Sequence, residues 1–161
     1  MTDWPSFYEA INEIKFTMLV THDEAGLMQA RPFTTQVAGR EGAVWFFTRT
    51  DSDVVADIRR DENVLLCYAD SSKNRFISSS GTATLSHDKA LISELWKPAY
   101  TTFFPAGVDD PALCLLRVQI AKADIWDSDK SAMERMVTMA KAAVGIKVDK
   151  DELGEHAVLK K

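Results

Sequence analysis

Five consecutive hydrogen-bonding side chains, Thr48 to Ser52, follow an apolar run in the stretch VWFFTRTDSDVVADIRR. Three hydroxyls and one guanidinium in this segment are donors that an anion could accept from. The apolar spacing after them predicts a helix over residues 52–60. Where a strand passes into a helix, the first N–H groups of the helix are unpaired and the helix dipole favours an anion. The turn therefore caps the helix through Asp51 or Ser52, or binds an anion, and the two roles are compatible.

A second set of donors lies in the run QARPFTTQ. Strand alternation places Arg31 on one face with Phe33, and Pro32 on the other face with Thr34. Pro32 removes one donor from the hydrogen-bond ladder and indicates an edge or an irregularity. An arginine in mid-strand belongs to a solvent-exposed stripe, or its fork of N–H groups meets a carbonyl, a ring nitrogen or a phosphate.

A third candidate is the aromatic segment that contains Trp96, Tyr100, Phe103 and Phe104. Such residues pack in a core or a dimer interface, or they line a site for a planar ring. A planar heteroaromatic molecule with a phosphate tail would use the arginine strand, the polar turn and these rings together. Flavin mononucleotide (FMN) fits that description.

Other chemistry finds less support in the sequence. Cys67 and Cys114 each lie in an apolar run, which is typical of buried, reduced thiols rather than of a disulfide or a nucleophile. His22, His87 and His156 lack the paired spacing of zinc ligands. Neither the phosphate-loop motif nor the dinucleotide glycine motif occurs.

The elements that must position these residues alternate between short strands and short helices. Short connections favour an antiparallel barrel, because parallel strands need a crossover each time. One domain over residues 1–161 is expected, with Ser86 capping the third helix and a charged tail that frays beyond Gly145. We expect helices over 4–15, 52–60, 86–96 and about 129–144, and strands over 16–22, 27–37, 43–48, 63–70, 75–86 and 112–126.

The composition bounds the class of protein. The chain has 161 residues, a hydrophobic fraction of 46% and a net charge of −5. A net negative charge argues against a nucleic-acid partner or an anionic membrane surface, both of which attract basic proteins. No apolar run reaches the length of a membrane span and no secretory signal begins the sequence, so a cytoplasmic protein is expected.

Several stretches resemble a known family. They are similar to general stress proteins of the pyridoxamine-phosphate-oxidase-like, FMN-binding split-barrel superfamily, over roughly residues 10 to 127. The most specific stretch is LWKPAYTTFFPAGVDDPALCLLRV, followed by the pair Trp126-Asp127. The other matching pieces are ARPFT, VWFFTRTDS, VLLCYAD and FISSSGTATL.

The resemblance implies an α+β, mainly β fold: a six-stranded antiparallel split β-barrel of Greek-key type with flanking helices. It also implies a homodimer that holds FMN, or FAD, at the subunit interface. The strand Arg31 to Thr34 would run along the isoalloxazine and ribityl chain, and the turn after Phe47 would reach the phosphate. The implied cofactor-binding residues are Arg31, Pro32, Phe33, Thr34, Phe47, Thr48, Arg49, Ser52 and Trp96.

One departure from the family concerns the phosphate. Family members commonly carry Lys or Arg shortly after the serine of this turn, whereas this chain continues with Asp53-Val54. Because a charge-assisted hydrogen bond is about twice as strong as a neutral one, FMN should bind less tightly. Arg49, Arg31 or Lys73 of the partner subunit would have to substitute, unless the site prefers FAD or stays empty.

Three functional hypotheses follow. The first is a flavin-binding protein of the general stress type whose redox capacity resides in the flavin. The second is an NAD(P)H-dependent flavin oxidoreductase that acts on a small organic acceptor. The third is an interaction module without flavin. No catalytic residue is assigned, and the tail GIKVDKDELGEHAVLKK matches no substrate residues of the true oxidases, so oxidation of pyridoxamine phosphate is not predicted.

Overall fold

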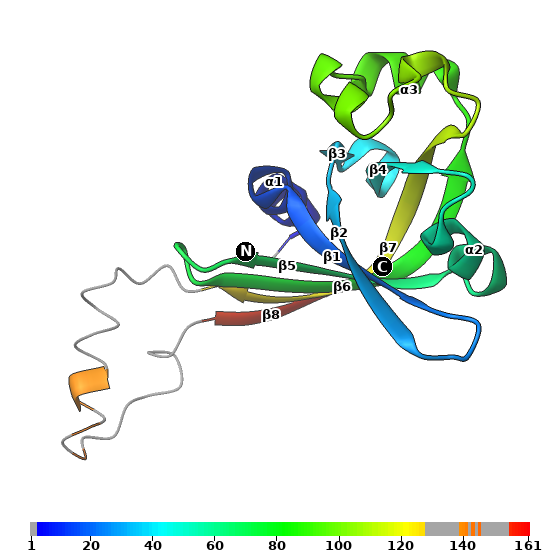
Figure 1. Cartoon of the computed structure of the whole chain (residues 1–161). Helices are drawn as coiled ribbons and strands as arrows, with labels where there is room; N and C mark the ends of the chain where they lie inside the picture. Colours follow the sequence, from blue (N-terminus) through cyan, green and yellow to red (C-terminus); the bar gives the residue numbers. More distant parts are fainter. Residues whose placement is uncertain (1–2, 128–138, 142, 144, 146–154) are drawn as a thin grey trace.

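One curled antiparallel sheet forms the body of the protein (Figure 1). The structure is a computed structural model that describes residues 3–127, 139–141, 143, 145 and 155–161. The strands run in the order β2-β1-β5-β6-β7-β4-β3, and β8 pairs with β7. The bounds are α1 (Trp4–Ile14), β1 (Phe16–His22), β2 (Met28–Thr34), β3 (Val37–Ala38), β4 (Ala43–Arg49), α2 (Asp53–Arg60), β5 (Asn63–Asp70), β6 (Arg75–Ser86), α3 (Lys89–Leu95), β7 (Leu113–Asp127) and β8 (Glu155–Lys160). Short 3₁₀ turns occupy η1 (Arg40–Gly42), η2 (Pro98–Thr102) and η3 (Gly107–Asp109).

The sheet closes on itself because the segment from residue 28 to residue 38 pairs first with β1 and then with β4. The strand expected over 27–37 is two strands, because β2 pairs with β1 and β3 pairs with β4. At the change, the Thr35 amide donates to the Lys15 carbonyl at 2.7 Å, and the Gln36 amide donates to the Trp45 carbonyl at 2.9 Å. The two ends of the sheet are thereby joined, which gives the predicted split β-barrel with flanking helices.

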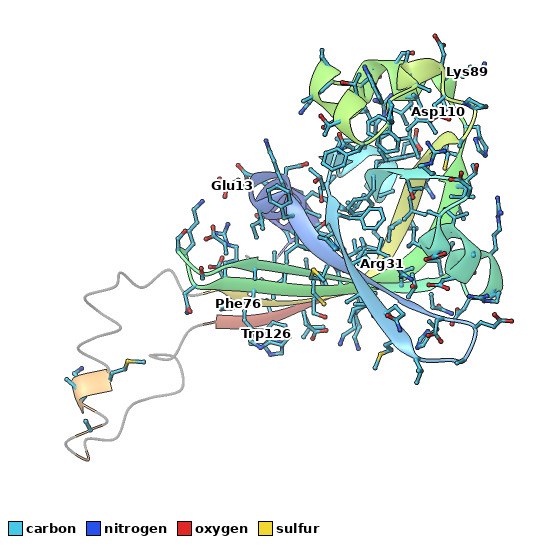
Figure 2. All side chains as sticks on the ribbon, viewed as in Figure 1. Glu13, Arg31, Phe76, Lys89, Asp110 and Trp126 are labelled. Carbon is cyan, nitrogen blue, oxygen red and sulfur yellow. The ribbon has the colours of Figure 1, made fainter. Side chains whose placement is uncertain are left out.

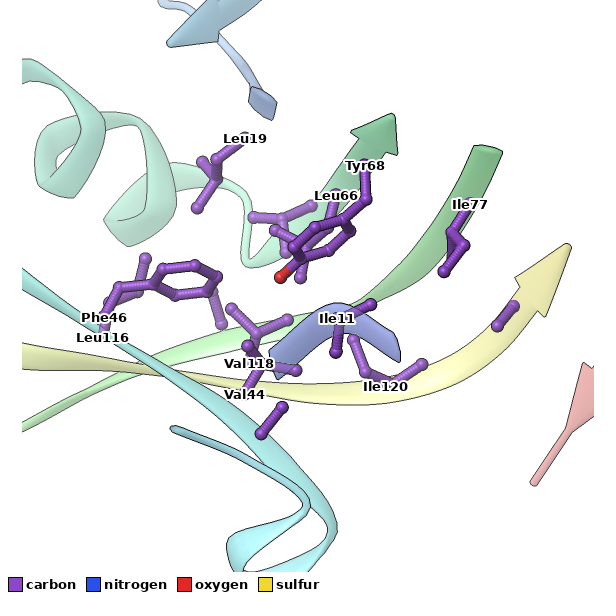
Figure 3. Packing of buried hydrophobic residues seen from close by; sticks show 14 of the residues in the cluster. Ile11, Leu19, Val44, Phe46, Leu66, Tyr68, Ile77, Leu116, Val118 and Ile120 are labelled. Atoms are coloured by element: carbon purple, nitrogen blue, oxygen red, sulfur yellow. The ribbon is translucent and has the colours of Figure 1, made fainter. Parts of the chain in front are cut away.

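Strand β4 is buried on both faces, which explains why its sequence reads as a continuous apolar run. Val44 and Phe46 face the barrel interior, where α1 contributes Ile11 (Figure 3). Trp45 and Phe47 face a second cluster under α3 and the aromatic segment. A strand with two buried faces can therefore present a ring outside the barrel while its neighbours stabilise the core.

The helices begin close to the expected residues, with two changes in capping. Helix α3 is capped by Asp88, whose carboxylate accepts from the amides of Ala90 and Leu91, and not by Ser86. The first residue of α2 follows Ser52, but the Ser52 hydroxyl donates to the Arg49 carbonyl instead of capping the helix. In the part of the chain that the structure describes, no helix is long and apolar enough to cross a bilayer.

The tail contributes a strand that the sequence analysis did not predict. Residues 155–160 form β8 along the second half of β7, where fraying was expected. Together with the division of the second strand, this gives eight strands in the described residues instead of six. The helix expected over about 129–144 falls largely outside the described residues.

Candidate flavin site beside β2 and the aromatic segment

An apolar cavity of about 370 Å³ lies between β2 and the aromatic segment that follows α3. Its lining residues come from β1, β2, the β2–β3 link, β4 and the segment 100–104, which meet because β2 crosses over toward β4. They are Phe16, Pro32, Phe33, Thr34, Gln36, Phe47, Tyr100, Phe103 and Phe104.

The rings that form the wall are fixed by contacts with one another. Phe47 lies edge-on to Tyr100 and Trp96, with ring centroids 5.5 and 5.8 Å apart. Trp96 also lies edge-on to Tyr100 at 5.9 Å, so it supports the wall from behind. Edge-to-face pairs at these separations are favourable, and the wall is therefore ordered before any ligand binds.

A polar group tethers the aromatic segment to the barrel. The Tyr100 hydroxyl donates to Gln36 Oε1 at 2.6 Å, and Gln36 Nε2 donates to the Thr34 carbonyl at 3.0 Å. Two further lining residues, Phe16 and Phe103, are exposed to solvent by 68% and 74% and mark the mouth of the cavity. Such large exposed rings at a cavity mouth are typical of a binding surface.

The polar turn after β4 lies next to the cavity in sequence, since it follows Phe47, but its side chains bond to one another. Thr48 and Ser52 hydroxyls are 3.3 Å apart. Arg49 pairs with Asp51 at 3.0 Å and with Asp110 at 2.7 Å. These hydrogen bonds, first that to Asp51 and then that to Asp110, raise the pKa of Arg49, and the Arg49 hydrogen bond lowers the pKa of Asp51.

Arg31, labelled in Figure 2, is only partly exposed and bonds to side chains of β1 and α2. Its guanidinium donates to Asp57 Oδ2 at 2.9 Å and to Thr21 Oγ1 at 2.8 Å. Asp57 is buried and also accepts from Thr21 and from Arg60 at 2.6 Å. Burial by itself would raise the pKa of Asp57, but the hydrogen bonds from Thr21 and Arg31 and the charges of Arg31 and Arg60 hold it below its usual value.

The structure brings together part of the predicted site. Pro32, Phe33, Thr34 and Phe47 line the cavity, as do three rings of the predicted aromatic segment, Tyr100, Phe103 and Phe104. The remaining predicted residues border it or lie outside its lining: Arg31, Thr48, Arg49, Ser52 and Trp96.

Two cavity residues were missed from the sequence. Phe16 begins β1, and its exposure follows from the alternating pattern of that strand, which buries the other face. The sequence carried no signal for this exposure, because Phe16 shares its face with the apolar Met18 and Val20. Gln36 gave no signal, because its role depends on the change of strand partner at Thr35.

The thiols and imidazoles form no second site among the described residues. Cys67 and Cys114 are both free, and burial raises the pKa of Cys114 to about 11. No group of three or more potential metal ligands occurs among the residues that the structure describes.

Comparison with known proteins gives the chain a family. The family model described as "Pyridoxamine 5'-phosphate oxidase like" matches residues 3–149. Protein bli-3 of Neurospora crassa is 24% identical over 140 residues, which cover 81% of this chain and 67% of that protein.

Solved structures agree on the fold. The putative general stress protein 26 from Jannaschia sp. CCS1 is 22% identical with a TM-score of 0.77, over 98% of this chain and 97% of that one. The general stress FMN/FAD binding protein from Xanthomonas citri is 31% identical with a TM-score of 0.67, over 79% of this chain and 89% of that one. The chain therefore belongs to the pyridoxamine 5'-phosphate oxidase-like family.

Proposed function

We propose that the protein binds a flavin nucleotide, FMN or FAD, with the isoalloxazine ring in the cavity beside β2. The observation that carries this proposal is the apolar cavity walled by Phe47 and Tyr100. Its volume lies in the range of small-molecule sites, which are mostly apolar with a few placed polar groups. Gln36 and Thr34 are such groups at this cavity. A relative that is 31% identical is described as an FMN/FAD binding protein.

The side chains that line the cavity suit the binding of a planar ring better than they suit acid–base catalysis. Its lining contains no carboxylate, imidazole or amine. A bound flavin would supply the redox chemistry, while the chain would supply position, exclusion of water and electrostatics. Binding is therefore the first function to test, and turnover with a nicotinamide is the second.

Titration tests the proposal. Flavin fluorescence at a fixed ligand concentration should fall as protein is added, because an aromatic wall quenches a stacked isoalloxazine. Phe103→Ala removes an exposed ring from the cavity lining and leaves the core unchanged. Flavin affinity should fall about three- to tenfold, because one aromatic contact is lost. Leu27→Ala, which removes an exposed apolar side chain outside the cavity, is the control.

Three results distinguish the hypotheses. Absence of quenching and of any calorimetric signal with FMN and FAD would refute flavin binding. Equal effects of Phe103→Ala and Leu27→Ala on flavin affinity would show that the isoalloxazine binds outside this cavity. Anaerobic addition of NADH or NADPH to the flavin complex should leave the flavin absorbance unchanged in a carrier or sensor, whereas bleaching would establish an oxidoreductase.

A second copy of the chain is proposed to complete the site. The outward face of the sheet carries large exposed apolar side chains from four strands, and Trp126 projects from it on the side away from α1 (Figure 2). Register places Phe16 opposite Thr34 and Met18 opposite Pro32, so this face continues into the cavity mouth. The exposed set on these strands is Phe16, Met18, Met28, Phe76 and Trp126.

A face of this kind favours an isologous dimer that buries the open side of both cavities. Light scattering at micromolar concentration should give twice the chain mass of 18.0 kDa. Met18→Lys, placed at the centre of the face between β2 and β5, should produce monomers and weaken flavin binding together. A monomeric wild-type protein that binds flavin would contradict the shared site.

A further inference from the structure

We infer that the cavity selects its ligand through the ring and gains little from a terminal phosphate, so that the protein binds riboflavin about as tightly as FMN. This inference rests on the proposed flavin site and specifies which flavin chemistry that site accepts. It follows from the charges of the polar turn itself and from the pairing of Arg49, Arg31 and Lys73.

The turn after β4 carries more negative than positive charge. Arg49 contacts Asp51 and Asp110. Asp53, two residues after Asp51, is the first residue of α2. Within this set of four side chains, one guanidinium against three carboxylates leaves two net negative charges, whereas a phosphate would need positive charge. A phosphate adds up to two more negative charges, so it would meet repulsion from this segment.

The geometry of Arg49 leaves few of its donors available. Nε and Nη2 donate to the two carboxylate oxygens of Asp51, at 3.0 and 3.1 Å. Nη1 donates to Asp110 Oδ2 at 2.7 Å, and the Asp110 side chain is almost fully buried. Both edges of the guanidinium are therefore engaged, and a phosphate would have to displace the exposed carboxylate of Asp51 or the buried carboxylate of Asp110.

The hydroxyls and the helix terminus offer no compensation. Ser52 donates its hydroxyl proton to the Arg49 carbonyl at 2.7 Å, and Thr48 Oγ1 lies against the same hydroxyl. The first turn of α2 already contains the carboxylate of Asp53, which satisfies the preference of the helix dipole for negative charge.

The two further cations that the sequence analysis offered as substitutes, Arg31 and Lys73, are both paired. Arg31 donates to Asp57 and Thr21 and is absent from the cavity lining. Lys73 pairs with Glu13 at 2.8 Å on the α1 side of the molecule, away from α2 (Figure 2). In a dimer, Lys73 of the partner subunit would carry the same ion pair with its own Glu13.

Comparative titration of the wild-type protein tests the inference. Riboflavin, FMN and FAD are titrated under the same buffer and salt, by fluorescence and by calorimetry. A single charge-assisted bond to phosphate worth about 1.4 kcal/mol would make FMN tenfold tighter. The expected result is dissociation constants for FMN and riboflavin within about fivefold of each other. A larger preference for FMN overturns the inference while leaving flavin binding intact.

A charge reversal supplies the second test. Asp53 is exposed, so Asp53→Lys can be made without loss of core packing. It should tighten FMN about tenfold and leave riboflavin unchanged, since one cation at the turn can then pair with the phosphate. Glu9→Lys makes the same change in net charge on the exposed face of α1 and should alter neither ligand.

The outcomes separate the two proposals. If Asp53→Lys shifts neither affinity, the turn is not near the ligand tail and the inference fails. If riboflavin, FMN and FAD all give no signal, the proposed function fails first, and the inference falls with it. Binding of all three with similar affinity, together with an FMN-specific gain in Asp53→Lys, supports both.

Discussion

Replacing Asp57 by alanine should destabilise the protein by about 3 kcal/mol. Asp57 is 3% exposed and accepts hydrogen bonds from Thr21, Arg31 and Arg60. Removal of one member of a buried ion pair costs about 3–5 kcal/mol, because the remaining charge loses its partner. The Arg31 and Arg60 side chains are 28% and 44% exposed and can recover water, which places the expected cost at the lower end.

Urea unfolding followed by circular dichroism measures this cost. Asp57→Asn keeps an acceptor oxygen and the shape of the side chain, so about half of the loss is expected, near 1.5 kcal/mol. For a domain of this size, 3 kcal/mol corresponds to a fall in Tm of about 6–12 °C. Glu62→Gln changes an exposed carboxylate with no ion pair in the described chain and should stay within about 0.5 kcal/mol of wild type.

The pH dependence has a defined sign. The folded state lowers the pKa of Asp57, so the carboxylate stabilises the fold above the ordinary Asp pKa of about 3.9. That contribution is lost as the pH falls through the lowered pKa. The difference in the free energy of unfolding between wild type and Asp57→Asn should therefore be constant from about pH 5 to 8 and become smaller below pH 4. A cost below about 1 kcal/mol for Asp57→Ala, or a gap unchanged at pH 3, would refute the reasoning.

The remaining predictions concern backbone and thiols. Gly81→Ala should cost more than about 3 kcal/mol in urea unfolding, because its Cβ would lie 2.1 Å from the Gln119 carbonyl oxygen at the irregularity of β6. Gly26→Ala, where only the positive φ of 78° is strained and no atom lies within 4 Å, should cost about 1 kcal/mol; the opposite ranking would contradict the packing argument. Cys114, buried with a pKa of about 11, should react with a thiol reagent at pH 8 only on unfolding, and rapid labelling of the folded protein would show that β7 opens.

Much of the fold could be predicted because local pattern and tertiary burial agree. Phe46 and Phe47 lie in a continuous apolar run, and that run is a strand with both faces buried. The short connections indicated antiparallel pairing, and every strand pair of the described sheet is antiparallel. Strand β8 was not predictable from its charged sequence, because it gains its partners only from the edge of β7.

The site was predictable only where a residue's own type carried the signal. Rings such as Tyr100 and Phe104 indicated a wall, and they form one. The contact between Arg31 and Asp57 was not predicted, because the carboxylate lies on a helix 26 residues away in the sequence; contact of Arg31 with a ligand stays a prediction. The sequence carries no sign that Asp57 is buried, because a carboxylate in a short helix that also contains Asp53, Arg59 and Arg60 is normally exposed. The role of Gln36 depends on a change of strand partner that no local pattern encodes.

Strand β7 gives the tail a protective role. Its first half pairs with β4 and its second half with β8 along the same side, so residues 155–160 cover the backbone of Lys122–Asp127. Without them, a row of unpaired N–H and C=O groups would face solvent, and such an edge is a template for strand addition by another molecule. Loss of β8 should thus appear first as poor solubility and self-association during expression, before any change in ligand affinity. The charged segment that looks dispensable in the sequence therefore covers backbone of β7 that would otherwise form an open edge.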